Sequence, residues 1–272
     1  MNESIEILKL LLYFFLYSII GWILESAYKS ILEKRVINSG FLHGPYCPIY
    51  GFGAVIMLIF LENFEHNLIL LFLMGFFILS IWEYLVGFVL EKVYHTKYWD
   101  YSESRFNIKG RICLLNSCYW GVLGVIFIKI IHPIVQEVVG NMEQNWILGI
   151  DIILFLIFTS DFIVSNVKVK GIDKKLEKLK EITENMREKL EEIRKAKTEE
   201  LQNEEFIQGL KEALEDLKLK QNKLKINLYK QSTRLKKAFP TIQSDKINEI
   251  LKKEIDLKAL KNRIHKSKES KK

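Results

Sequence analysis

The sequence has few of the residues that mark familiar enzymes. Its 272 residues contain three cysteines, and none of them has a clustered histidine that would complete a zinc site. A G-x-x-x-x-G-K-[ST] phosphate loop and an H-E-x-x-H zinc helix are both absent. No serine has the context of a Ser-His-Asp triad. We therefore predict no catalytic group, no bound metal and no cofactor, and any ATP used must be bound by another chain.

Charge is scarce in the first part of the chain and abundant in the second. Residues 1–167 hold ten Lys and Arg and fourteen Asp and Glu, whereas residues 168–272 hold thirty and nineteen. The charge-poor part contains runs close to the ~20 apolar residues that cross a membrane as a helix. The five runs are 5–24, 45–61, 68–90, 112–131 and 146–167. We predict an all-α polytopic membrane domain over 1–167 with about five spans.

The loops between these runs predict the orientation. Loops 25–44 and 91–111 carry three and five basic residues, and loops 62–67 and 132–145 carry none. Because cytoplasmic loops accumulate Lys and Arg, we expect the N-terminus outside and the basic tail in the cytoplasm of a multi-pass cell-membrane protein. Cysteines on the cytoplasmic side remain reduced, so no structural disulfide is expected.

The membrane part contains a possible internal repeat. A shift of 58 residues aligns Glu25 with Glu83 and one Leu-Glu-Lys triplet with another, 32–34 with 90–92. Each copy then reaches an aromatic-Gly pair, Tyr50-Gly51 in one and Trp120-Gly121 in the other. A real duplication would give two parallel helical hairpins plus a fifth helix. Chance similarity between two apolar segments is the alternative.

Acids inside the apolar runs are the first candidate site, since a charge at the bilayer centre costs at least ~2.5 kcal/mol. Glu83 and Asp161 lie at similar predicted depth, and Arg111 is placed to reach either of them. Asp151 is expected to pair with Lys129. The predicted polar centre, which either binds a substrate or is structural, consists of Glu83, Asp161, Arg111 and Glu25.

Two loops rich in Gly, Pro and aromatic residues are the second candidate. The stretch GFLHGPYCPIYGFG, residues 40–53, cannot form a regular helix before residue 49 because Pro fixes φ and Gly permits positive φ. We expect a packed or re-entrant loop, the alternative being a tight turn with an interfacial aromatic belt. The candidate loop residues are His43, Gly44, Pro45, Tyr46, Pro48, Tyr50, Gly51, Trp99, Asp100, Tyr101, Asn107 and Gly110.

The same stretches carry a family resemblance. G-F-L-H-G-P-Y-C-P-I-Y-G-F-G, W-E-Y followed by E-K-V-Y, Y-W-D-Y-S and N-I-K-G-R-I-C-L with W-G after it resemble the ABC-transporter type IV family of bacterial membrane permeases. The resemblance covers about 21–124. It implies a permease component of a transporter in the bacterial plasma membrane, without a known substrate.

The charged tail has helical spacing of its apolar residues. Leu210, Leu214 and Leu217 begin a run that alternates by four and three, which is typical of a coiled-coil seam. Residues 168–240 are predicted to form a coiled coil, as one rod or as a helical hairpin, and residues 241–272 a short basic helix able to touch anionic lipid headgroups. Interspersed Lys and Glu do not favour nucleic-acid binding.

The primary functional prediction is therefore a permease component that works with a separate ATPase subunit. The alternative is a membrane anchor whose coiled coil recruits a cytoplasmic partner or forms a homo-oligomer. A third and weaker interpretation is a lipid-modifying enzyme that uses the membrane acids and His43.

Overall fold

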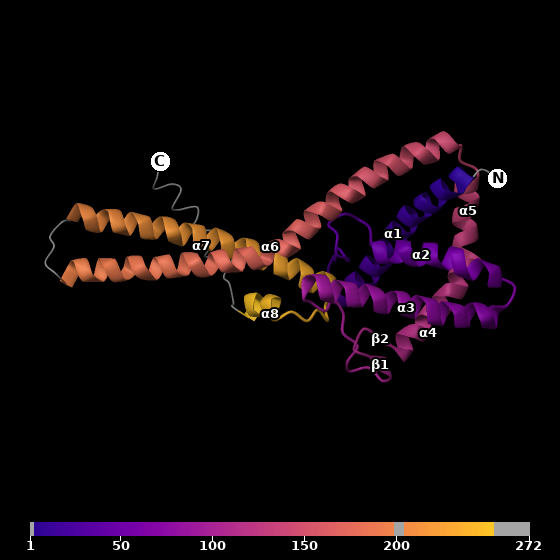
Figure 1. The fold of residues 1–272 in the computed structure, drawn as a ribbon, viewed down its shortest axis with the longest axis horizontal. Helices are drawn as coiled ribbons and strands as arrows, with labels where there is room; N and C mark the ends of the chain where they lie inside the picture. Colours follow the sequence, from indigo (N-terminus) through magenta and orange to yellow (C-terminus); the bar gives the residue numbers. More distant parts are fainter. Residues whose placement is uncertain (1–2, 199–203, 253–272) are drawn as a thin grey trace. The chain divides into compact units, whose positions relative to one another are not determined.

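The computed structural model describes residues 3–198 and 204–252, which are nearly all helical (Figure 1). A short two-stranded antiparallel hairpin precedes α4. The elements are α1 Glu3–Glu33, α2 Pro48–Leu61, the 3-10 turn η1 Glu62–Phe64, α3 Leu68–Tyr94, β1 Asn107–Ile108, β2 Ile112–Cys113, α4 Leu114–Ile126, the π-helical turn η2 Phe127–Ile131, α5 His132–Gly140, α6 Gln144–Thr198, α7 Glu204–Ala238 and α8 Asp245–Lys252.

The chain divides into two compact units. The membrane unit consists of Met1–Asn166 together with Leu235–Ser244, and the tail unit consists of Val167–Arg234 together with Asp245–Lys272. Both α6 and α7 are continuous through a unit boundary, so the last turn of α7 belongs to the membrane unit. Residues 253–272, the greater part of the predicted basic helix, lie outside the described residues.

Four helical segments are long and apolar enough to cross a membrane. They are Ser4–Glu33, Leu68–Tyr94, Leu114–Gly140 and Gln144–Ala196, and Pro48–Phe64 is a shorter apolar helix. The prediction of a helical membrane protein is thus confirmed. The second of the five predicted spans is the shorter helix, because Pro48 fixes where it begins and Glu62 opens the turn that follows.

The segment 132–145 corrects the expectation of a loop. Residues up to Gly140 are helical, since Pro133 falls in the first turn of α5, directly after the π-helical turn, where its missing N–H costs little. His132 is buried there and lies 2.9 Å from the Tyr17 hydroxyl. The expected Asp151–Lys129 ion pair is not formed. Lys129 is exposed, and the buried Asp151 carboxylate accepts no hydrogen bond from the described residues.

Glycines allow close helix packing within each of two hairpins. In the α1–α2 pair, a Cβ on Gly51 would lie 2.4 Å from the Phe14 carbonyl oxygen and 2.8 Å from its ring. In the α3–α4 pair, a Cβ on Gly121 would lie 2.6 Å from the Phe72 ring. Phe14 and Phe72 are 58 residues apart, and the two glycines occupy the aromatic-Gly positions of the predicted repeat. The two glycines are 70 residues apart, because the second copy has the longer loop. Both hairpins therefore pack a phenylalanine ring against the glycine of an aromatic-Gly pair.

Substitution of Gly51 by Ala is expected to destabilise the membrane unit by about 1–3 kcal/mol, because the new methyl group overlaps the Phe14 backbone and α1 and α2 must separate. Gly149→Ala is the matched control, since nothing lies within 4 Å of its added Cβ. Thermal unfolding in detergent measures both variants. Equal melting temperatures for the two variants would show that the α1–α2 contact is looser than described.

The tail unit pairs α6 with α7. Lys175 Nζ donates to Asn227 Oδ1 and to Gln231 Oε1, each at 3.0 Å. Further along α6, Thr183 Oγ1 accepts from Gln221 Nε2 at 2.9 Å. Because residue numbers rise on α6 while they fall on α7, the helices are antiparallel, as in the hairpin alternative and unlike a single rod.

Candidate functional site

The carboxylate of Glu83 is buried between α3 and α4. The residue is 4% exposed and accepts hydrogen bonds from three neutral side chains. Asn116 Nδ2 donates at 2.8 Å, Trp120 Nε1 at 2.9 Å and the Tyr101 hydroxyl at 3.1 Å. Asn116 and Trp120 are four residues apart, so they share one face of α4. No Lys, Arg or His in the described part of the chain forms an ion pair with this acid.

Glu25, the residue that the predicted repeat aligns with Glu83, has a cation. Lys29 Nζ lies 2.6 Å from Glu25 Oε1, one helical turn away on α1. The Cys47 thiol donates to the other carboxylate oxygen at 3.6 Å. Burial raises the pKa of this thiol, and the negative charge of Glu25 raises it further. Cys47 is therefore a protonated thiol at neutral pH.

Tyr101 and Tyr50 lie close enough to both acids to interact with their charges. Burial raises the pKa of Tyr101, with the charge of Glu83 the next cause and that of Glu25 a smaller one. The rings of Tyr50 and Trp120, which belong to the aromatic-Gly pairs after the two loops, have centroids 6.5 Å apart. We call these five residues, Glu25, Glu83, Tyr50, Tyr101 and Trp120, the carboxylate centre. Sequence analysis proposed Glu25 and Glu83 as members of one polar centre, and the structure brings them together.

Asp161 performs a different task, because it holds the Gly/Pro loop. Its carboxylate accepts from the backbone N–H of Gly44 at 2.7 Å and of His43 at 3.0 Å. Ser165, one turn further along α6, donates to Asp161 at 3.1 Å and lies 2.7 Å from His43 Nδ1. A Cβ on Gly44 would lie 2.5 Å from the Tyr46 ring, so a side chain does not fit there. The loop is therefore packed, as one of the two alternatives predicted.

The end of the same loop begins α2. The Cys47 N–H donates to the carbonyl oxygen of Ser18 on α1 at 2.9 Å. Pro48 then occupies the first turn of α2, where a helix needs no N–H from it. Pro45 lies between the residues held by Asp161 and this anchor, and it is exposed.

Tyr46 is expected to make the loop sensitive to alkali. Burial raises its pKa from 10.0 to about 12, and the nearby charge of Asp161 contributes to the shift. Because the raised pKa favours the neutral phenol in the folded loop, this stabilisation is complete below about pH 10 and is lost as the pH rises through about 12. Phenolate absorbance of wild type minus Tyr46→Phe should reveal one phenol that ionises near the upper value. Ionisation near the lower value would place Tyr46 in solvent.

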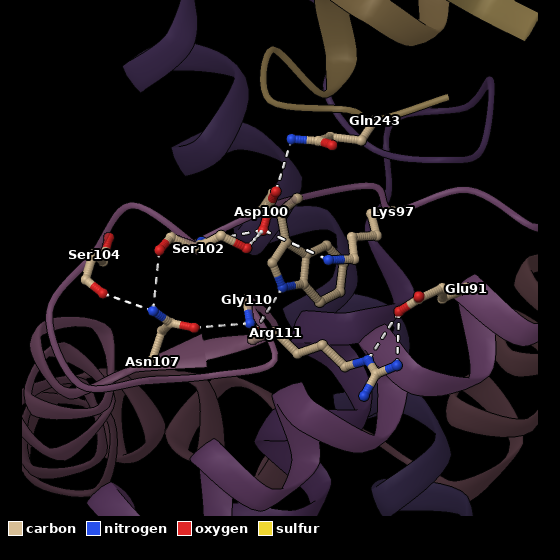
Figure 2. Close-up of polar contacts among 10 residues, drawn as sticks. Glu91, Lys97, Asp100, Ser102, Ser104, Asn107, Gly110, Arg111 and Gln243 are labelled. Carbon is tan, nitrogen blue, oxygen red and sulfur yellow. Dashed lines mark hydrogen bonds and ion pairs between the residues drawn. The ribbon is translucent and has the colours of Figure 1, made fainter. Parts of the chain in front are cut away.

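The second loop is a self-contained turn with its own hydrogen bonds (Figure 2). Asp100 Oδ1 accepts from the Ser102 N–H at 3.1 Å and from its hydroxyl at 2.5 Å. Asn107 donates to the carbonyl oxygen of Ser104 at 2.8 Å and accepts from the Gly110 N–H at 3.0 Å. Gly110 has a φ of +70°, which favours glycine. These contacts orient the loop so that Tyr101 reaches Glu83.

Arg111 corrects the predicted grouping. Its guanidinium lies 2.7 Å from Glu91 Oε2 (Figure 2). It also donates to the Tyr84 hydroxyl at 3.1 Å. It therefore reaches neither Glu83 nor Asp161, because Glu91, which lies a little over two turns nearer the end of α3, takes the charge. The Trp99 indole fixes the Arg111 backbone by donating to its carbonyl oxygen at 2.9 Å. The predicted polar centre thus separates into the carboxylate centre, the Asp161 clamp and the Arg111–Glu91 pair.

Sequence reasoning missed the partners of the two acids. Asn116 and Trp120 were detectable as polar donors at helical spacing in an apolar run, and Lys29 as a cation four residues after Glu25. Cys47 gave no such signal. Among residues 3–198 and 204–252, no group of three or more His, Cys, Asp or Glu side chains is arranged to hold a metal ion.

A nearly all-helical chain with four segments able to cross a bilayer, and with carboxylates buried between helices, is a polytopic membrane protein. It belongs to the family described as "Putative ABC-transporter type IV", whose model matches residues 12–166. That match covers more than half of the chain and includes Glu25, Glu83 and Asp161, and it ends at the boundary of the tail unit. No curated protein and no solved structure matches the chain significantly.

Proposed function

We propose that the protein is a permease component of a transporter, and that the carboxylate centre binds the transported solute or a coupling ion. The single observation that carries the proposal is Glu83. It is a carboxylate inside a helix able to span a membrane, it is 4% exposed, and three neutral side chains donate to it. Charged groups in such positions are costly, and they commonly mark substrate or ion pathways.

The hydrogen bonds at Glu83 favour a cationic or proton-donating ligand. Neutral donors stabilise a carboxylate without cancelling its charge. A cation near Trp120 and Tyr50 would also meet the faces of aromatic rings, which attract positive charge. The family membership and the absence of a phosphate loop from the sequence support a separate ATPase subunit as partner. We further propose a plasma-membrane location with the tail and both basic loops in the cytoplasm.

A second candidate is a membrane scaffold that binds a protein partner or a second copy through the tail. The antiparallel contacts of Lys175 with Asn227 and Gln231 favour it, because they describe an extended helical hairpin outside the family-matched region. The apolar residues of α6 and α7 would then form the coiled coil that the sequence predicts over 168–240. Under this alternative the carboxylate centre only holds α1 to α4 together.

The test compares the solute content of cells that lack the gene with that of three complemented strains. These strains carry the wild-type gene, Glu83→Gln or Glu65→Gln. Untargeted mass spectrometry of cells and medium identifies any solute whose distribution depends on the gene. We expect wild type and Glu65→Gln, which changes an acid outside the carboxylate centre whose side chain is 44% exposed, to restore that distribution, and Glu83→Gln to fail while it is still inserted and monodisperse. Full restoration by Glu83→Gln would refute a role of this acid in transport.

A further inference from the structure

Residues 235–244 belong to the membrane unit although the helix that leads into them belongs to the tail unit. Leu235, Ala238 and Ile242 are buried, with exposed fractions of 2%, 0% and 2%. We call Leu235–Ser244 the strap. It contains the end of α7 and the connection to α8, and Pro240 lies two residues after the last helical position, where it prevents continuation of the helix.

The strap is bound to the loop before β1 by backbone pairing. The Gln243 N–H donates to the Lys97 carbonyl oxygen at 2.8 Å, and the Lys97 N–H donates to the Gln243 carbonyl oxygen at 3.2 Å. The Gln243 side chain adds a hydrogen bond to Asp100 Oδ2 at 2.7 Å (Figure 2). Ser102 contacts the other carboxylate oxygen, Oδ1. An antiparallel bridge with both hydrogen bonds is a specific docking mode for an extended segment.

The strap also reaches the cation of Glu25. Phe239 packs edge-on against Tyr98 with ring centroids 4.9 Å apart, and Lys29 Nζ lies 5.5 Å from the Phe239 ring centroid. The same ammonium donates to the Ala238 carbonyl oxygen and, at 2.6 Å, to Glu25. Lys29 is thus shared between the strap and an acid of the carboxylate centre. With the strap docked, the Lys29 side chain is 16% exposed and the Glu25 side chain 21%.

Both flanks of the strap are attached to the tail unit. Before it, Gln231 of α7 contacts Lys175 of α6, and after it, Lys246 of α8 forms a 2.7 Å ion pair with Asp173 of α6. A partner or ligand that rearranges the tail hairpin would therefore pull on the strap from both ends. Removal of the strap would leave Lys29 with Glu25 as its only partner from this set of contacts.

We propose that the strap is a built-in gate of the carboxylate centre: when docked, it holds Lys29 in place and restricts access to Glu25 from the predicted cytoplasmic side, and its release widens that access. The biological role of the gate rests on the proposed transport function, whereas the opening and closing of the strap does not. Access of water-soluble reagents can be measured without any transport, so the two proposals can fail separately.

Cys47 is a native probe of this access, because its thiol contacts Glu25 and is 2% exposed. In a full-length Cys113→Ala/Cys118→Ala background, the labelling rate of Cys47 by a membrane-impermeant maleimide is measured in membranes. Phe239→Ala/Gln243→Pro removes the ring contact and one bridge hydrogen bond, and Gln208→Ala on the exposed face of α7 is the control. We expect about a tenfold or greater rise in rate for the double variant only. Trypsin cleavage after Lys236 or Lys237 shows that the strap of the double variant is no longer docked.

A second variant closes the gate instead of opening it. In the same background, Lys97→Cys/Gln243→Cys places two cysteines at a hydrogen-bonded antiparallel pair, whose spacing suits a disulfide. Oxidation is expected to cross-link them and to slow Cys47 labelling, and reduction should restore the rate. Failure to cross-link would refute the docked strap. If the oxidised double-cysteine variant and a trypsin-cleavable Phe239→Ala/Gln243→Pro variant label Cys47 at the same rate, the gate is refuted. This holds even if transport depends on Glu83.

Discussion

Glu83→Ala is expected to lower the free energy of unfolding of the membrane unit by about 3 kcal/mol or more. The substitution removes the acceptor for Asn116, Trp120 and Tyr101 at once, and each buried donor left without a partner costs about 1–3 kcal/mol. Glu83→Gln should lower the free energy of unfolding less than Glu83→Ala, because the glutamine keeps one oxygen that accepts hydrogen bonds. Its NH2 group would face the Asn116 amide. The measurement is thermal or denaturant unfolding in detergent or lipid discs.

The control for this prediction is Glu65→Ala, which removes a half-exposed acid from the turn before α3 and leaves no buried donor unpaired. It should melt like wild type. If Glu83→Ala also melts like wild type, the three donors are solvated in the folded protein. Glu83 would then lie in an open aqueous space and not between packed helices.

Asp161→Ala is expected to release the Gly/Pro loop and to raise the hydrogen-exchange rates of the His43 and Gly44 amides by about a hundredfold. Both amides donate to the Asp161 carboxylate. Hydrogen bonds to a charged group contribute about 1.5–3 kcal/mol each, and about 2.7 kcal/mol of lost opening free energy corresponds to a hundredfold change. The measurement is exchange by mass spectrometry on peptides that cover 40–47.

Asp173→Ala is the matched control, since it removes an exposed acid further along the same helix and breaks only its pair with Lys246. Peptides over 40–47 should exchange as in wild type in this variant. Unchanged exchange in Asp161→Ala would mean that the loop is held by its other contacts, such as the Cys47 N–H to Ser18 bond. The assignment of Asp161 as a clamp would then be wrong.

The sequence predicted the helices and the important acids better than it predicted their partners. Apolar run length identifies membrane helices because it reflects a property of each segment alone. It placed the end of the fourth run at residue 131, whereas the helix continues through a π-helical turn and α5 to Gly140. Glu83 and Asp161 stood out as charges within apolar runs. Their partners did not, since Arg111 had several acids within plausible reach and only the packed fold selects Glu91.

The contacts of the strap were also not predictable from the sequence. The predicted coiled-coil segment 168–240 stops close to the end of α7 at Ala238. Nothing in the residues around Gln243 indicated that they pair with Lys97, because an isolated bridge between distant segments leaves no periodic pattern in the sequence. Similarly, the sequence alone did not show that Phe14 packs against Gly51 and Phe72 against Gly121.

The structure also shows how the tail can be tested without damage to the membrane unit. A truncation after Lys170 would remove the strap, which belongs to the membrane unit, and would confuse loss of the tail with loss of the gate. Leu214→Asp/Leu228→Asp instead places charges at two buried positions of α7 within the tail unit. This variant weakens the hairpin and keeps the strap residues in the chain.

The most direct test of the central claim is affinity purification from native membranes in mild detergent, with wild type compared with Leu214→Asp/Leu228→Asp and the co-purifying chains identified by mass spectrometry. A permease component is predicted to bring down a nucleotide-binding subunit from both samples, because the family-matched region, 12–166, is unchanged. Recovery of no nucleotide-binding chain, with every partner lost when the hairpin is weakened, would contradict the account and make the protein a membrane anchor.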